Sequence, residues 1–135
     1  MSQENVEIVK ALYDAFERRD NESPFDVYDA EIIWDASRFA PPGMSGVFHG
    51  HEGVRTFFGR WLDAWETIDF EIQRVIPAGE DVVVIVRQTN RGRASGVEIE
   101  QGPYAQVWTL RSGRVVRFTY FGTPEEALEA VGLRE

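Results

Sequence analysis

The sequence predicts an α+β fold in which the helices come first along the chain and antiparallel strands follow. A helical period of 3.6 residues runs through residues 48–65, and a second helical stripe lies near the start of the chain. After residue 70 the period changes to two residues, which is typical of strands. Strands and helices do not alternate as they do in a parallel sheet, which favours α+β. The length of 135 residues predicts one domain over residues 1–135.

The stretch FHGHEGVRTFFGRWLDAW at residues 48–65 predicts the central helix. Gly50 interrupts what precedes the helix, and Glu52 places negative charge in its first turn, where the helix dipole favours it. The apolar positions recur at steps of three and four, at Val54, Phe57, Phe58, Trp61, Leu62 and Trp65. Because this face carries four aromatic rings, we expect it to pack on the concave side of a sheet.

The first third of the chain predicts two further helices and a strand. The first helix begins at Ser2, and its apolar stripe consists of Val6, Val9, Leu12, Tyr13 and Phe16. Ser23 and Pro24 are a good N-cap and first residue for a short helix over 24–28. A strand over 32–34 follows, and the proline- and glycine-rich residues 38–46 are expected to form a loop.

The second half predicts four antiparallel strands, over residues 70–76, 82–90, 97–110 and 115–121. Residues 82–86 are continuously apolar, which suits a strand covered on both faces. The turns are expected at residues 77–81, at 91–96 and at Ser112-Gly113, and the third strand is expected to bend at Gly102-Pro103. A last helix begins after Thr123, with Pro124 and Glu126 completing a capping box, and ends at Gly132.

Composition narrows the classes of function. Hydrophobic residues make up 43% of the chain and the net charge is −9, which favours a packed core and disfavours nucleic acid or an anionic membrane as partners. The chain has no cysteine, so disulfides and thiolate chemistry are excluded. The N-terminal residues have no signal-peptide pattern and no stretch is long enough to span a bilayer, so we expect a cytoplasmic protein.

Neither charged cluster in the sequence predicts a metal or phosphate site. His49, His51 and Glu52 stand together, but a complete ligand set would need distant carboxylates, so we expect a loop-to-helix cap. Arg91 and Arg93 lie beside glycines without a phosphate-binding Lys-Ser/Thr sequence, which favours a solvated hairpin. We therefore predict no metal and no cofactor.

The aromatic content predicts a ligand cavity. Four tryptophans, nine phenylalanines and four tyrosines exceed what so small a core needs, and ligand sites are commonly apolar with a few polar groups. The polar residues that interrupt apolar elements are Tyr13, Asp35, Arg87, Gln106 and Tyr120. The two-residue period leaves open whether Tyr104, Gln106 and Trp108 face inward or their neighbours Ala105, Val107 and Thr109 do.

Asp35 is the strongest candidate for acid–base chemistry. It ends the first predicted strand directly after Trp34, and an indole beside a carboxylate raises the carboxylate's pKa, which suits a general base. The alternative is a structural role, in which Asp35 closes the strand through an Asx turn with Ser37.

Motifs along nearly the whole chain resemble one protein family. They are Leu12-Tyr13 with Phe16, Ile33-Trp34-Asp35, residues 48–54, Gln106 to Leu110, Tyr120-Phe121 and Glu126 to Leu128. The pattern is similar to the SnoaL-like, ketosteroid isomerase-like branch of the nuclear transport factor 2-like superfamily. The resemblance implies a cone-shaped roll, in which a strongly curved sheet wraps the helices around a central pocket, and a homodimer formed through the outer sheet face.

The resemblance also implies a candidate site. In ketosteroid isomerase-like enzymes a strand-end aspartate moves a proton beside a phenol, so Asp35 and Tyr13 are the expected catalytic residues. The place of that family's second aspartate falls at Ala105 or Gln106, so a carboxylic-acid donor is missing. The residues expected to bind a small apolar, polyketide- or steroid-like ligand are Trp34, Phe39, Phe57, Trp61, Arg87, Gln106, Phe118 and Tyr120.

Several functions stay open at this point. The chain is a cofactor-independent isomerase or cyclase, a non-catalytic ligand-binding or dimerisation domain, or an epoxide-hydrolase-like enzyme in which Asp35 and Arg87 act on water. The missing second acid favours binding, whereas an aspartate beside an indole favours catalysis. Exposed apolar residues on the outer sheet face, either Trp108 and Leu110 or Val107 and Thr109, would mark the dimer interface.

Overall fold

The computed structural model describes residues 2–41 and 43–133 and confirms the α+β class. The elements are α1 (Ser2–Glu17), η1 (Ser23–Asp26), β1 (Tyr28–Ala36), β2 (Gly46–His49), α2 (Gly50–Ala64), β3 (Trp65–Ala78), β4 (Asp81–Gly92), β5 (Glu98–Arg111), β6 (Arg114–Phe121) and α3 (Pro124–Ala130). Within these described ranges, no helix is long and apolar enough to cross a membrane.

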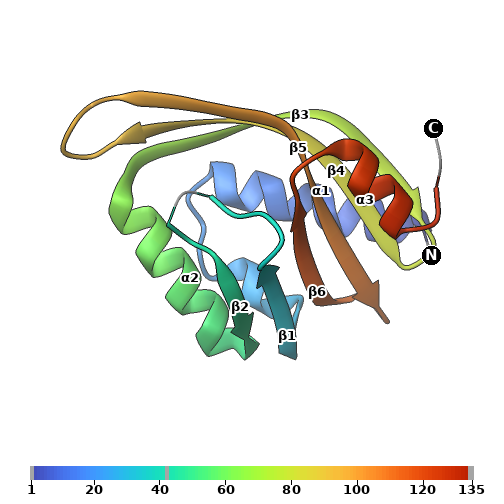
Figure 1. Cartoon of the computed structure of the whole chain (residues 1–135). Helices are drawn as coiled ribbons and strands as arrows, with labels where there is room; N and C mark the ends of the chain where they lie inside the picture. Colours follow the sequence, from blue (N-terminus) through green and yellow to red (C-terminus); the bar gives the residue numbers. More distant parts are fainter. Residues whose placement is uncertain (1, 42, 134–135) are drawn as a thin grey trace.

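The strands form one six-stranded mixed sheet in the order β2-β1-β6-β5-β4-β3. Strands β3 to β6 are a continuous antiparallel meander, as predicted, whereas β1 runs parallel to β6. Figure 1 shows the sheet curling, with its β2–β1 end beside α2. The sheet does not close, so β2 and β3 remain as its edges.

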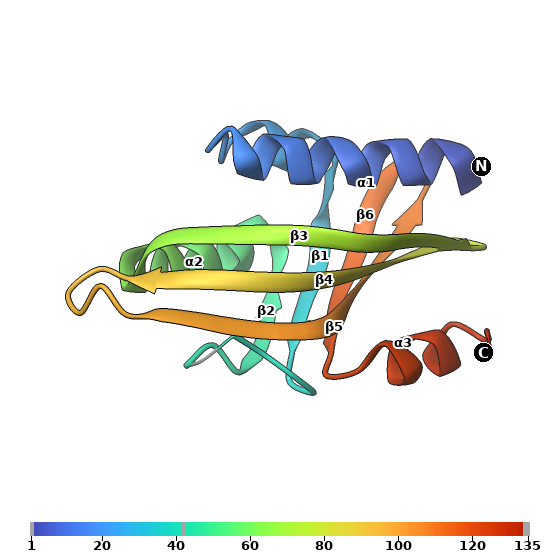
Figure 2. The same cartoon turned by 90° about the horizontal axis from the view of Figure 1, so that it is seen from above.

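Helices cover both faces of the sheet. Figure 2 shows α1 on one side of the β3–β4–β5 ribbon and α3 on the other. The helix α3 covers a small outer cluster that includes Val83, Ile85, Ala105 and Phe121. The larger cluster lies inside the curve of the sheet, where α1 and α2 pack. This arrangement is the cone-like roll that the resemblance implies.

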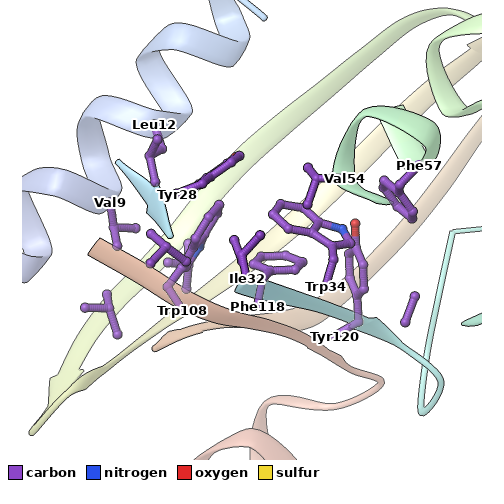
Figure 3. Packing of buried hydrophobic residues seen from close by; sticks show 14 of the residues in the cluster. Val9, Leu12, Tyr28, Ile32, Trp34, Val54, Phe57, Trp108, Phe118 and Tyr120 are labelled. Atoms are coloured by element: carbon purple, nitrogen blue, oxygen red, sulfur yellow. The ribbon is translucent and has the colours of Figure 1, made fainter. Parts of the chain in front are cut away.

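The central helix packs inside the cone as its periodicity predicts. Val54, Phe57 and Trp61 are at most 2% exposed, and Figure 3 shows Val54 and Phe57 beside Trp34, Phe118 and Tyr120 of the sheet. The helix ends at Ala64 and β3 starts at the next residue. The predicted helix end at Trp65 and strand start at residue 70 are therefore wrong.

Arg93 anchors the end of the central helix. Its guanidinium donates to the carbonyl oxygens of Leu62 and Asp63, at 2.9 and 3.2 Å. A cation at a helix C-terminus satisfies unpaired carbonyls and complements the helix dipole. The β4–β5 hairpin is thus tied to α2, which fixes one wall of the space between the helix and the sheet.

Strand β5 is bent by a bulge at Gly102. The pairing of β4 with β5 shifts between Val86 and Gln88, so Gly102 and Pro103 stand opposite Arg87. Gly102 has φ +109°, and a Cβ there would lie 2.7 Å from the Val86 carbonyl oxygen. Only glycine fits so close to a neighbouring strand at this φ. The predicted bend at Gly102-Pro103 is confirmed.

Candidate functional site

A cavity of about 280 Å³ opens between the concave face of the sheet, the helices α1 and α2, and the η1 segment. Its floor is formed by sheet residues, namely Trp34, Phe70, Gln106, Trp108, Phe118 and Tyr120. Its walls come from helix residues, including Leu12, Tyr13 and Phe16 of α1 and Phe58, Trp61 and Leu62 of α2. The lining is therefore mainly aromatic, as expected of a site for an apolar ligand.

Six of the ten predicted site residues line this cavity: Tyr13, Trp34, Trp61, Gln106, Phe118 and Tyr120. The structure also settles which face of β5 is inside, because Gln106 and Trp108 line the cavity while Ala105 and Val107 join the outer cluster. The cavity residues that sequence reasoning missed include Tyr28, Phe58 and Trp108. Their signal was present in the same periodicities, since Phe58 lies on the predicted helix stripe and Trp108 alternates with Gln106.

Phe39, Phe57 and Arg87 are not in the cavity wall. Phe57 is fully buried in the core, where its ring lies 5.9 Å from that of Trp34 and 6.1 Å from that of Tyr120. Phe39 packs on Tyr104 at 5.1 Å, outside the cavity. Arg87 forms a 3.3 Å ion pair with Glu100 on the surface. The structure therefore places these three predicted ligand-binding residues outside the cavity lining, because strand alternation and core packing direct their side chains elsewhere.

Asp35 is also outside the cavity. Successive side chains of a strand point to opposite faces, so Asp35 points outward while Trp34 points into the cone. The Asp35 carboxylate accepts hydrogen bonds from the backbone N–H and hydroxyl of Ser37, at 2.9 and 2.6 Å. It also accepts one from Arg117, at 2.5 Å. The predicted position of Asp35 at the cavity is wrong, and the Asx turn with Ser37 is what the structure contains.

The electrostatics of Asp35 agree with this structural role. Burial raises the pKa of its carboxyl, but the hydrogen bonds from Ser37 and the charge of Arg117 outweigh burial, so the net shift of the pKa is downward. The predicted rise of the Asp35 pKa is therefore wrong. A carboxylate with a lowered pKa is a weaker base, which removes the main argument for Asp35 as a proton shuttle.

Replacing Asp35 with asparagine is expected to destabilise the protein at neutral pH. Because the folded pKa lies below the unfolded one, ionised Asp35 stabilises the fold above the unfolded pKa of about 3.9. That contribution is lost as the pH falls through the folded pKa. We expect Asp35→Asn to lower the free energy of unfolding by about 0.5–1.5 kcal/mol at pH 7, with partial screening at half-exposed Arg117, and by less at pH 3.

Urea unfolding at the two pH values measures this effect. Asp29→Asn is the matched control, because Asp29 lies on the same strand and its carboxylate accepts from the backbone N–H of Glu31, without an arginine partner. An Asp35→Asn protein as stable as the wild type at pH 7 would contradict the assignment.

Tyr13 is the polar centre of the cavity wall. The Trp108 indole N–H donates to the Tyr13 oxygen at 3.0 Å, and the Tyr13 hydroxyl donates to the Gln106 side-chain carbonyl. Part of the Tyr13 ring remains accessible, yet burial of its hydroxyl raises the pKa well above its ordinary value. Tyr13 is therefore a neutral phenol at physiological pH.

The hydrogen bonds continue from Gln106 beneath the cavity floor. The Gln106 side-chain amide donates to the Tyr104 hydroxyl at 2.9 Å, and that hydroxyl donates to the carbonyl of Gln88. The Gln88 amide donates to the Asn90 side-chain carbonyl at 2.8 Å. We call this chain the polar relay; in order it comprises Trp108, Tyr13, Gln106, Tyr104, Gln88 and Asn90. Gln88, Asn90, Tyr104 and Gln106 are at most 2% exposed.

Two further phenols line the cavity. Burial raises the pKa values of Tyr28 and Tyr120 far above the ordinary value, so both are neutral. The Trp34 indole beside Tyr120 opposes part of this rise in the Tyr120 pKa. Both residues belong to the cavity lining, so their phenols are candidate polar contacts for a ligand.

Among the described residues, the charged side chains that line the cavity stand at its mouth. Arg55 of α2 pairs with Glu22 at 3.3 Å, and its guanidinium stacks over the ring of Phe25 at 3.9 Å. Asp20 lies at the same rim. The two contacts of Arg55, with Glu22 and with Phe25, link the η1 region to α2 across the opening of the cavity. Since both side chains of the Arg55–Glu22 pair are exposed, the link is weak and can open for a ligand.

The two histidines have structural positions at the start of α2. His49 is the N-cap residue of α2 without a side-chain capping bond, and the His51 ring lies 2.9 Å from the Tyr28 carbonyl oxygen. Over the described ranges, no three histidine, aspartate or glutamate side chains lie together as metal ligands would.

The model of the SnoaL-like domain matches residues 9–118, so the chain belongs to the SnoaL-like domain family. The resemblance stated from the sequence motifs is thereby confirmed. No curated protein matches the chain.

Solved structures share the fold. An NTF2-like protein of unknown function from Burkholderia pseudomallei K96243 is 24% identical over 98% of this chain and 99% of its own, with a TM-score of 0.78. TerC, co-crystallised with polyporic acid, is 21% identical over 95% and 98% of the two chains, with a TM-score of 0.76. A candidate SnoaL-like polyketide cyclase from Mesorhizobium loti is 16% identical over 85% and 96%, with a TM-score of 0.66. At these identities the likeness shows the fold alone.

Proposed function

We propose that the protein binds a neutral, mainly apolar ring compound in the cavity between its helices and sheet. The observation that carries the proposal is the combination of an aromatic wall with three neutral phenols, Tyr13, Tyr28 and Tyr120. Such a wall gains free energy by burying apolar surface, while a few hydroxyls orient the ligand. A polyketide- or steroid-like compound has this chemistry, and TerC, a protein of the same fold, was co-crystallised with polyporic acid.

Binding without chemistry is the favoured form of this function. The acids that line the cavity, Asp20 and Glu22, stand at its mouth, and the described residues place none in its interior. An isomerase or cyclase reaction would thus have to use a phenol of the cavity wall, such as Tyr13, as its proton-bearing group in place of Asp35. The epoxide-hydrolase alternative loses its support, since Asp35 and Arg87 lie outside the cavity lining and belong to separate ion pairs, with Arg117 and Glu100 respectively.

We also infer a homodimer in the cytoplasm, with an interface smaller than the sequence suggests. Trp108 and Leu110 lie inside the cone, and α3 covers Val107. The part of the outer face that α3 leaves uncovered carries the half-exposed side chain of Arg117 and Val47, which is 45% exposed. Two-fold pairing is the commonest way in which such a face is covered. Sedimentation that finds only monomers at high concentration would contradict the dimer.

Filling the cavity tests the binding function. Leu62 lines the cavity from α2, and Leu62→Trp is expected to weaken binding of a flat tricyclic probe such as 9-fluorenol at least about ten-fold. Leu62→Met, which conserves volume, is the control and should bind like the wild type. Isothermal titration calorimetry measures both affinities, and circular dichroism verifies the fold. Equal affinities in folded wild-type and Leu62→Trp proteins would place the binding site elsewhere.

A further inference from the structure

The hydrogen bonds of the polar relay all run in one direction, from donor to acceptor, starting at the Trp108 indole. An indole N–H can only donate, so one lone pair of the Tyr13 oxygen is occupied by Trp108. The single Tyr13 proton goes to Gln106 and the single Tyr104 proton goes to Gln88. Every donor in the relay thus points from Trp108 toward Asn90. The Tyr13 oxygen keeps one lone pair that no described residue occupies, and Tyr13 belongs to the cavity wall.

The reverse direction is the competing arrangement. If the amides of Asn90, Gln88 and Gln106 turned over, each would donate toward Tyr13, and the Tyr13 proton would point into the cavity. In that arrangement the Tyr13 oxygen would accept from both Trp108 and Gln106, and its proton would need an acceptor on the cavity side. The observed direction gives the Tyr13 proton to Gln106 instead and ends at the Asn90 amide nitrogen, which has no partner among the described residues.

We propose that the polar relay presents Tyr13 to the cavity as a hydrogen-bond acceptor, so that the bound ring compound carries a hydroxyl at this point. This inference rests on the proposed binding function and makes its ligand more specific. A carbonyl at the same point would meet a lone pair and repel it unless the relay reversed. Gln88, Tyr104 and Asn90 are therefore positioning residues that act on the ligand through Tyr13, although Gln88 and Asn90 lie outside the cavity wall.

Neutron diffraction from the deuterated, ligand-free protein tests the direction itself. We expect the Tyr13 deuteron to lie between Tyr13 and Gln106, and the deuterated amide of Gln106 to face Tyr104. A Tyr13 deuteron that points into the cavity would overturn the proposal. This measurement requires no ligand and no variant.

A matched pair of probes tests the consequence for the ligand. 9-Fluorenol and 9-fluorenone differ in whether the ring carries a hydroxyl or a carbonyl. Gln88→Leu removes the acceptor of the Tyr104 proton, so Tyr104 turns to Gln106, the Gln106 amide turns to Tyr13, and the Tyr13 proton is released into the cavity. We expect the ratio of the two dissociation constants to shift toward the ketone by about five-fold, which corresponds to one hydrogen bond of about 1 kcal/mol.

The control variant is Thr89→Val, next to Gln88 but on the other face of β4. It is expected to leave the ratio unchanged, even if it changes both affinities. A Gln88→Leu protein with the wild-type ratio would overturn the proposal, because a purely structural role moves both constants together. If neither probe binds the wild type, the proposed binding function is contradicted, while neutron diffraction still decides the direction of the relay.

Discussion

Replacing Phe57 with alanine is expected to lower the free energy of unfolding by about 3–5 kcal/mol, the range for a buried phenylalanine. Phe57 is 0% exposed and its ring contacts those of Phe48, Trp34 and Tyr120. The substitution leaves a cavity at the point where α2, β1, β2 and β6 meet, and rigid aromatic neighbours cannot collapse into it. Chemical denaturation measures the loss as a lower midpoint at an unchanged slope.

Phe57→Leu is the matched control for this prediction. Leucine restores most of the apolar volume, so we expect it to cost clearly less than alanine. Arg60→Ala, one turn along the exposed face of the same helix, should cost little, since alanine is a good helix former. A midpoint that barely moves in Phe57→Ala would mean that α2 does not pack inside the cone.

Replacing Gly102 with alanine is expected to cost about 2–4 kcal/mol, for a reason unrelated to burial. The new Cβ would lie 2.7 Å from the Val86 carbonyl oxygen and 3.2 Å from the Arg87 Cα, at a φ of +109°. These are backbone atoms of the neighbouring strand, so they cannot move without opening the β4–β5 ladder. Thermal and urea unfolding both measure the loss.

Gly79→Ala separates strain of this kind from the general cost of a positive φ. Gly79 has φ +64° but open space where its Cβ would be, so its substitution should cost about 1–2 kcal/mol, the penalty of a left-handed residue alone. Equal losses at the two glycines would show that the bulge has no steric role.

The order of the elements could be predicted because each is long and strongly periodic. Two features of the fold could not. The short strand β2 has four residues, none of them fully buried, and it exists because β1 offers it an open edge. The parallel pairing of β1 with β6 joins residues far apart in sequence, and local periodicity carries no information about such partners.

The candidate site was predicted best where a residue type and a face agreed. Tyr13, Trp34, Trp61 and Gln106 are on apolar stripes and face the cavity. The prediction that Asp35 faces the cavity is wrong because it assumes that a residue next to Trp34 in sequence lies on the same face of the strand. Strand alternation places neighbours on opposite faces, and that rule, applied at Trp34, predicts an outward Asp35.

The far end of the polar relay was missed for a different reason. Gln88 and Asn90 follow an apolar strand and look like its solvated continuation, although both are at most 1% exposed. Their alternation with Val86 places them on the inner face, but burial of two amides is stable only if they bond to each other and to Tyr104. Whether these side chains can form hydrogen bonds with one another depends on the β4–β5 register, which the bulge at Gly102 shifts.

The open edge at β3 has a consequence for how copies of the chain behave in concentrated solution. An edge strand offers unpaired backbone groups on which another molecule can add a strand and start aggregation. In β3, exposed charged side chains occupy the edge, at Glu66, Asp69, Glu71 and Arg74. The pairing of β3 with β4 is irregular near Thr67 and Arg74, and Pro77 withholds one backbone donor. Charge, twist and proline together make this edge a poor template, so the sheet can stay open without recruiting strands from its neighbours.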